Sequence, residues 1–359
     1  MLLKRCLLLC FIFCLGTTAA TSQTVNIDAV NKYWELTARL RQNLPVTDPM
    51  WNDFINMEGN KTYAHSEFTD KDLAYYRRAI ELVYMPANDS LLQVNLKKNN
   101  WYCLLAKRYK DEEQALKRYL ADTVLKPSFF NSAYQYVYEY LPVKFQHPVA
   151  DLHLYYNCLS NDAVSYPNGL FFSLLSEIDN AKVKSGTLEA HELHHRLRQN
   201  IDMDGGRDTA MTARNAGLIW AMNAIPNEGI ADMIDKAPTL AVAGDPEGIG
   251  EWLLDPAPGT LQQLDSCIRM MALDTANHQS SRYYRNLLKN TTGHMPGFYM
   301  AGIIVRNGLK KQMIDGEEHP FNFFYTYNKA AGKDASKPFV FSAESMQYLK
   351  KLERAILRK

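Results

Sequence analysis

Three histidines and a glutamate lie within five residues of one segment, HELHH at 191–195. On an α-helix each residue turns the chain by about 100°, so His191 and His195 project within about 40° of each other, one turn apart. Two imidazoles placed in this way can bind one metal ion. His194 falls beside the apolar stripe of the same helix, and we expect it to form a hydrogen bond at the edge of the core. The stripe consists of Ala190, Leu193, Leu197 and Ile201.

Glu192 follows the first of these histidines and points toward the flank of the same helix face. From there its carboxylate can contact a water activated by the metal without binding the metal, which is the position of the general base in H-E-x-x-H hydrolases. A third ligand is supplied by the segment NEGIAD at 227–232, where Glu228 and Asp232 share one helix face. We therefore predict a catalytic Zn²⁺ site with an open fourth position for water. Its predicted ligands are His191, His195 and Glu228, with Asp232 as an orienting partner.

Together the two segments resemble the gluzincin zinc peptidases, which include thermolysin-like enzymes and zinc aminopeptidases. The resemblance covers about 185 to 236 and is carried by H-E-x-x-H and N-E-x-x-x-D. The pattern is also similar to uncharacterised exported bacterial proteins described only as zinc-dependent peptidases. The resemblance implies zinc binding by His191, His195 and Glu228, general base catalysis by Glu192, and orientation of His191 by Asp232.

The chain departs from these families in two respects. Glu228 comes 33 positions after His195, a longer gap than in thermolysin or the aminopeptidases, so the intervening segments must pack differently. A G-x-M-E-N motif is missing upstream, so an aminopeptidase is not predicted. Catalysis also needs a donor to the developing oxyanion, for which family analogy suggests a His or Tyr from the C-terminal part. The segment TTGHMPGFYMA at 291–301 offers His294 and Tyr299.

Two other functions are compatible with these motifs. One is an exported helical protein that binds a ligand between its many aromatic residues without catalysis, and the other is a zinc hydrolase of a non-peptide amide. A di-iron bundle is set aside because it needs a second E-x-x-H, which the sequence lacks. The segment DMDGGRD at 202–208 lacks the full acidic spacing of a calcium loop and is expected to end a helix at Gly205 and Gly206.

The N-terminal residues have the layout of a secretory signal peptide, with Lys4 and Arg5 before an apolar run at 6–15 and small residues after it. A run of about ten residues is too short to cross ~30 Å of hydrocarbon, so we expect cleavage near Ala20 and export to the periplasm or the medium. Three cysteines remain after cleavage, which permits one disulfide with a free thiol or three buried thiols. They are Cys103, Cys158 and Cys267.

Charge and hydropathy narrow the choice of partner. With 40 Lys and Arg against 39 Asp and Glu, the chain has no bulk charge that would favour nucleic acid. No later segment has the roughly 20 apolar residues of a membrane helix, so we expect no stable membrane insertion. A peptide or protein substrate is the predicted partner, and the oligomeric state is left open.

The elements that must position the motifs are mostly helical. From 25 to 142, apolar residues recur three and four apart between proline breaks. The apolar runs 150–159 and 169–178 are predicted as two strands joined by a turn. After HELHH we expect a helix over 209–224 and a new one from Pro226 to just before Pro238.

The predicted fold class is therefore mainly α with a small β-sheet (α+β), in which short strands precede a zincin-like active-site helix. We divide the chain into a signal peptide, an N-terminal helical region, a catalytic core and a C-terminal helical region, packed as one body. Their predicted bounds are 1–20, 21–145, 146–245 and 246–359.

Overall fold

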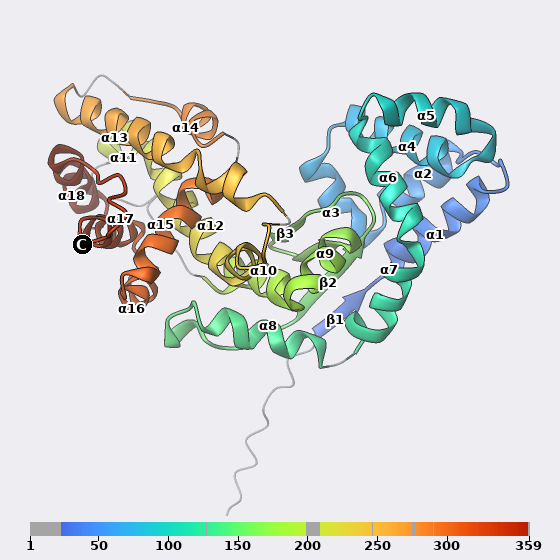
Figure 1. The fold of residues 1–359 in the computed structure, drawn as a ribbon, viewed down its shortest axis with the longest axis horizontal. Helices are drawn as coiled ribbons and strands as arrows, with labels where there is room; N and C mark the ends of the chain where they lie inside the picture. Colours follow the sequence, from blue (N-terminus) through green and yellow to red (C-terminus); the bar gives the residue numbers. More distant parts are fainter. Residues whose placement is uncertain are drawn as a thin grey trace, which may run out of the picture.

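The computed structural model describes residues 23–357 except 127, 199–208, 246, 275–277 and 290. The expected signal peptide and the DMDGGRD segment lie outside the described residues. The described chain is mainly α-helical with one small mixed sheet, so the predicted fold class is confirmed. Two helical lobes form a V, and the sheet lies at its base together with α9 and α10 (Figure 1).

The described part of the chain begins with a strand that the sequence pattern did not predict. β1 is only four residues long and is held by parallel pairing with β2, more than a hundred residues further along, so local periodicity cannot reveal it. The elements up to residue 145 are β1 (Gln23–Asn26), α1 (Asp28–Leu40), α2 (Asp48–Ile55), α3 (Glu58–Glu67), α4 (Asp70–Tyr84), α5 (Asp89–Lys97), α6 (Trp101–Asp111), α7 (Glu113–Tyr119) and α8 (Phe129–Tyr138), with short turns of helix at Pro86–Asn88, Leu120–Val124 and Val143–Phe145.

The base of the V contains β1 and α8 together with three further strands and two further helices (Figure 1). They are β2 (Leu152–Asn157), β3 (Ala163–Tyr166), β4 (Gly169–Ser173), α9 (Leu174–Lys184) and α10 (Thr187–Leu197). The strand order is β1-β2-β4-β3; the first three of these strands run parallel, and β3 is the antiparallel edge strand.

The prediction of two strands over 150–178 is wrong in part. The segment assigned to the turn forms β3, and the second run divides at Ser173, where β4 ends and α9 begins. The Ser173 hydroxyl accepts a hydrogen bond from the backbone N–H of Ser176 at 3.2 Å. A serine at this position satisfies one of the free donors at a helix start, which explains why the apolar run changes conformation there.

The C-terminal lobe contains the longest helix, α12. The predicted break at Pro226 is wrong, because α12 runs through both Pro226 and Pro238. A proline removes one backbone hydrogen bond, but α12 packs against α10, α14 and α15, and this packing maintains the helix across the defect. The elements are α11 (Thr209–Arg214), α12 (Ala216–Leu240), a turn of π-helix (Gly250–Leu254), α13 (Ala257–Leu273), α14 (Ser281–Leu287), α15 (His294–Arg306), α16 (Lys310–Asp315), α17 (Pro320–Ala331) and α18 (Ala343–Leu357).

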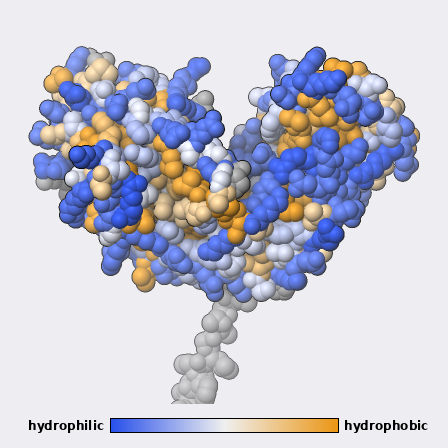
Figure 2. Space-filling view, viewed as in Figure 1, coloured by the Kyte–Doolittle hydropathy of each residue, from blue (hydrophilic) through white to orange (hydrophobic). Residues whose placement is uncertain are grey.

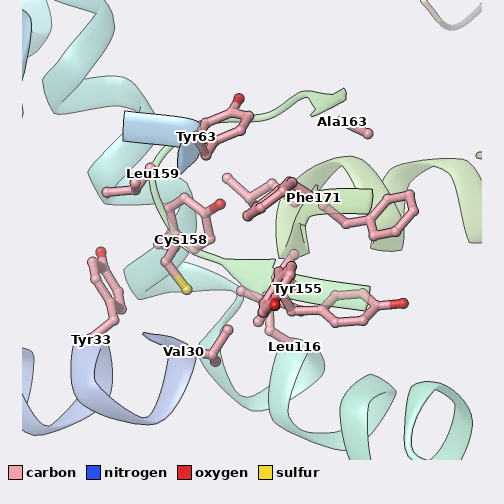
Figure 3. Close-up of a cluster of buried hydrophobic side chains, with 14 of the residues drawn as sticks. Val30, Tyr33, Tyr63, Leu116, Tyr155, Cys158, Leu159, Ala163 and Phe171 are labelled. Carbon is pink, nitrogen blue, oxygen red and sulfur yellow. The ribbon is translucent and has the colours of Figure 1, made fainter. Parts of the chain in front are cut away.

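Two large apolar clusters stabilise the lobes. One joins the N-terminal helices to the sheet and to α10, and part of it is shown in Figure 3, where Tyr33, Tyr63 and Cys158 lie close to the strands. The other lies among α12–α18. Every helix in the described part of the chain is too short or too polar to cross a bilayer. Cys103, Cys158 and Cys267 are all buried free thiols, which selects the second of the two cysteine alternatives.

A buried pair of carboxyl groups joins α9 to α10. Glu177 and Glu189 are each 1% exposed, and Tyr119 donates a hydrogen bond to Glu177 at 3.3 Å. Burial, together with the charge of its neighbour, holds the pKa of Glu177 well above 4.5, and burial raises the pKa of Glu189 to about 7. Glu177 therefore favours the protonated, neutral form in the folded protein.

Because of this pair, we expect the free energy of unfolding to depend on pH. The pKa values of both carboxyls are higher in the folded than in the unfolded protein. The stabilisation that the pair gives the folded state is therefore complete below pH 4.5 and is lost as the pH rises through about 7. For one carboxyl the loss is on the order of 3 kcal/mol. Glu177→Gln replaces one of the two titrating carboxyls by a neutral amide. We therefore expect the free energy of unfolding, measured by urea denaturation, to differ less between pH 5 and pH 8 in this variant than in the wild type. Equal pH dependence in both proteins would contradict this assignment.

Candidate metal centre

The helix that carries HELHH begins at a sharp turn. Gly186 has a φ of 88°, in the left-handed region, and a Cβ there would lie 2.5 Å from the Ser132 hydroxyl, so only glycine fits. Asn180 then covers the helix start, because its side-chain oxygen accepts from the Thr187 hydroxyl at 2.8 Å and from the Leu188 N–H at 3.2 Å. This turn and cap set the direction of α10 and of the side chains on it.

The imidazoles of the two predicted ligands converge on one carboxylate oxygen of α12. The Oε2 atom of Glu228 lies 3.2 Å from Nε2 of His195 and 3.7 Å from Nε2 of His191. The two rings are 4.8 Å apart between centroids. His191 and Glu228 are buried and His195 is nearly so, and a ligand atom from each of the three lies within 4.8 Å of the others. The structure thus brings together all three residues predicted to bind zinc.

The carboxylate that orients His191 is a different one from the prediction. Nδ1 of His191 lies 2.9 Å from Asp235 and 3.7 Å from Asp232, so Asp235 holds this ring. Asp235 is seven residues after Glu228, two turns along the same face of α12, and is 5% exposed. The i, i+4, i+7 spacing of Glu228, Asp232 and Asp235 indicates in the sequence that Asp235 shares the helix face of the other two carboxylates. It was missed because the predicted helix was matched to the shorter E-x-x-x-D motif.

Asp232 instead holds His294. Its carboxylate oxygens lie 2.9 and 3.1 Å from Nδ1 of His294, at the start of α15. Nε2 of His294 is then 3.4 Å from Oε2 of Glu228, although His294 is 103 residues beyond His191 in the sequence. Burial lowers the pKa of His294, but the carboxylates of Asp232 and Glu228 outweigh it and raise the pKa above 6.5. His294 therefore lies beside the predicted ligands.

A close helix crossing brings His294 to this place. A Cβ on Gly229 of α12 would lie 2.2 Å from the backbone carbon of Gly297, and one on Gly297 would lie 2.2 Å from the carbonyl oxygen of Ile225. The backbones of α12 and α15 are therefore in contact, which only glycine at both positions permits. Gly229 directly follows Glu228, and Gly297 is less than one turn from His294.

Tyr299, the other predicted donor, lies outside the group. Five residues beyond His294 on the same helix, it is turned away by about 140°. It is half-buried against the apolar clusters of the C-terminal lobe, near Arg306, and is not among the residues that line the cavity at the predicted ligands. The prediction that Tyr299 contributes to the site finds no support in this geometry.

Glu192 lies 5% exposed in the wall of a cavity of about 620 Å³ that also exposes His191 and His195. Burial raises the pKa of Glu192, and the two imidazoles beside it act in the opposite direction. The edge strand β3 forms another wall, from Asp162 to Tyr166. In Figure 2 the surface is hollowed between the two lobes.

A buried chain of polar groups supports Glu228 from the side away from the histidines. Asn227 donates to Oε1 of Glu228 at 3.2 Å and accepts from Arg198 at 2.9 Å. Arg198 lies 3.2 Å from the carboxylate of Glu317, which also lies 2.9 Å from Nε2 of His194. His194 is fully buried, so it lies deeper than the edge of the core where we expected it, and its partner comes from the C-terminal lobe.

The donor set fits zinc. Two imidazole nitrogens and one carboxylate oxygen are a common ligand set of catalytic zinc sites, which leave one position for water or substrate. Because Nδ1 of His191 faces Asp235, its Nε2 is directed at Glu228 and is free to bind metal. Burial raises the pKa of Glu228, but His195 and His294 outweigh it and hold that pKa well below 4.5, so the carboxylate is ionised.

Comparison with sequence families agrees with this chemistry. A family described as "Putative zinc dependent peptidase (DUF5700)" matches residues 51–336. The chain belongs to this family. No curated protein and no solved structure matches the chain significantly. The matched part of the chain includes β2, β3, β4, α10, α12 and the start of α15, and so contains every residue of the candidate metal centre.

Proposed function

We propose that this protein is a zinc-dependent peptidase of the gluzincin type, in which His191, His195 and Glu228 bind the metal. The observation that carries the proposal is the convergence of these three side chains on one point in the wall of the cavity. Membership of a family described as zinc-dependent peptidases supports the choice of metal and of reaction.

In this proposal Glu192 moves the proton. Zinc, when bound, makes water acidic enough to attack near neutral pH and polarises the scissile carbonyl. Glu192 accepts the proton of the attacking water, and its raised pKa favours holding that proton until the leaving amine takes it. The buried position of the carboxyl excludes bulk water, which would otherwise compete for the proton.

His294 is assigned to the developing oxyanion. Its Nδ1 donates to Asp232, so a proton on Nε2 makes the ring cationic, and the raised pKa of His294 favours that form. A cationic N–H donor in a partly buried site stabilises negative charge more strongly than a neutral one. Asp232 is then the residue that orients His294, in place of its predicted role beside His191.

The edge strand supports a peptide substrate over another amide. β3 pairs with β4 on one side only and lines the cavity that exposes Glu192. The unpaired N–H and C=O groups of an edge strand bind an extended peptide by adding it as a further strand. A peptide bound along residues 162–166 would pass beside the proposed zinc ligands. We also propose export through the N-terminal signal peptide, which the charge and apolar pattern of residues 1–20 supports.

Metal analysis together with a peptide library tests the proposal. The purified protein is expected to contain about one zinc per chain and to cleave internal bonds of unfolded protein, with loss of cleavage on chelation and recovery on return of zinc. A protein that binds no zinc would contradict the proposal and favour a helical ligand-binding protein without catalysis. Bound zinc with no cleavage of any peptide would instead point to a hydrolase of a non-peptide amide.

A further inference from the structure

A lysine joins the two aspartates of the candidate metal centre. Lys236 follows Asp232 by one turn of α12 and is adjacent to Asp235 in the sequence. Its Nζ lies 2.7 Å from Oδ1 of Asp232 and 3.1 Å from Oδ2 of Asp235. The side chain of Lys236 is 15% exposed and those of the two aspartates 0% and 7%, so solvent screens these contacts weakly.

Each aspartate also lies within hydrogen-bond distance of one imidazole. Asp235 faces Nδ1 of His191 through Oδ1, and Asp232 faces Nδ1 of His294 at 2.9 Å. The ammonium group therefore lies at the centre of a connected set with two carboxylates around it and one imidazole beyond each carboxylate. Moving Lys236 would release both carboxylates at once.

An ordinary lysine–aspartate pair on a helix surface would not have this consequence. Exposed i, i+4 pairs contribute about 0.3–0.5 kcal/mol and fix neither partner. Here two buried carboxylates lie on successive turns of one helix, and without a cation between them they would repel each other at low dielectric. Lys236 also lines the cavity, so a small solute can reach its position.

We propose that Lys236 is a positioning residue that cross-links Asp232 and Asp235 and thereby sets the direction of the Nε2 atoms of His191 and His294. One cation thus aligns a metal ligand and the oxyanion donor together. The effect on zinc rests on the proposed function, whereas the effect on the two imidazoles does not. Outer partners of metal ligands commonly change metal affinity about 10- to 100-fold when removed.

The test uses Lys236→Ala in the full chain, first without metal. In the wild type, ¹⁵N-labelled histidine is expected to show slowly exchanging Nδ1–H protons for His191 and His294, since both donate to buried carboxylates. In Lys236→Ala both signals are expected to broaden or shift, and zinc affinity, measured by competition with a chelator, is expected to fall about 10- to 100-fold. Propylammonium, which can occupy the vacated space, is expected to restore both properties.

Lys182→Ala is the matched control. Lys182 lines a second cavity together with Lys236, but it contacts Asp179 at 2.8 Å and its side chain is 60% exposed. Its loss should therefore change neither the Nδ1–H signals nor the zinc affinity. If Lys236→Ala does not fold, Lys236→Met keeps the apolar stem and removes only the charge. Unchanged Nδ1–H signals and zinc affinity in a folded Lys236 variant would overturn the proposal. If the wild type shows both Nδ1–H signals but binds no zinc, the proposed function is overturned, whereas the positioning of the two imidazoles by Lys236 is not.

Discussion

Glu192→Gln is expected to lower kcat for peptide hydrolysis by about 10²- to 10⁴-fold, the usual contribution of a general base. Glutamine has the shape of glutamate but cannot accept the proton of the attacking water. The side chain is buried in the wall of the cavity beside both histidines, so an isosteric change leaves the packing of α10 intact. Zinc content and melting temperature should therefore stay at the wild-type values while turnover is lost.

The control for this variant lies on the same helix. Arg196 is exposed on α10, one residue after His195, so Arg196→Gln changes a polar side chain on the helix without reaching the cavity. It should keep wild-type turnover. A Glu192→Gln enzyme that still cleaves peptides at the wild-type rate would show that another group accepts the proton.

Glu228→Ala is expected to abolish tight zinc binding, with a loss larger than the ~10- to 100-fold that follows removal of an outer partner. Nε2 atoms of three histidines lie within 3.7 Å of its Oε2 atom, so the carboxylate is the common point of the centre. Without it, only two of the three proposed ligands remain, His191 and His195, and the centre loses the negative charge that balances the metal.

Thermal unfolding with and without zinc measures this loss. A ligand present at about 100 times its Kd stabilises the folded state by about 2.7 kcal/mol, so the wild type should melt higher with zinc than with chelator, and Glu228→Ala should not. Glu67→Gln is the control, because Glu67 lines the same cavity but contacts the Tyr166 hydroxyl of the edge strand. If zinc raises the melting temperature of Glu228→Ala as much as that of the wild type, Glu228 is not a zinc ligand.

The local parts of the centre could be predicted from sequence because they depend on helix periodicity. His191 and His195 lie one turn apart on α10, and this spacing alone places their imidazoles on one face. Glu228 was predicted as the third ligand because the acidic motif follows the same rule on a second helix. The fold class was predictable for a similar reason, since most of the chain has three-to-four-residue apolar periodicity.

The prediction failed where distant contacts override local signals. Pro226 is a helix-start residue by its local chemistry, yet packing of α12 on its neighbours carries the helix through it. β1 exists only because β2 pairs with it. The orienting partner of His191 was assigned to Asp232 by analogy, whereas the packing of α10 on α12 places Asp235 nearer, at 2.9 Å against 3.7 Å.

The sequence by itself determined which side chains could bind a metal and which could move a proton, because one helical turn brings such residues together whatever surrounds them. Only the tertiary structure decided their partners. The contact of Gly229 with Gly297 brings His294 of α15 to Glu228, and Lys236 links the two aspartates behind the imidazoles. These relations depend on how helices far apart in sequence cross, and crossing geometry follows from packing over the whole interface and not from any local spacing.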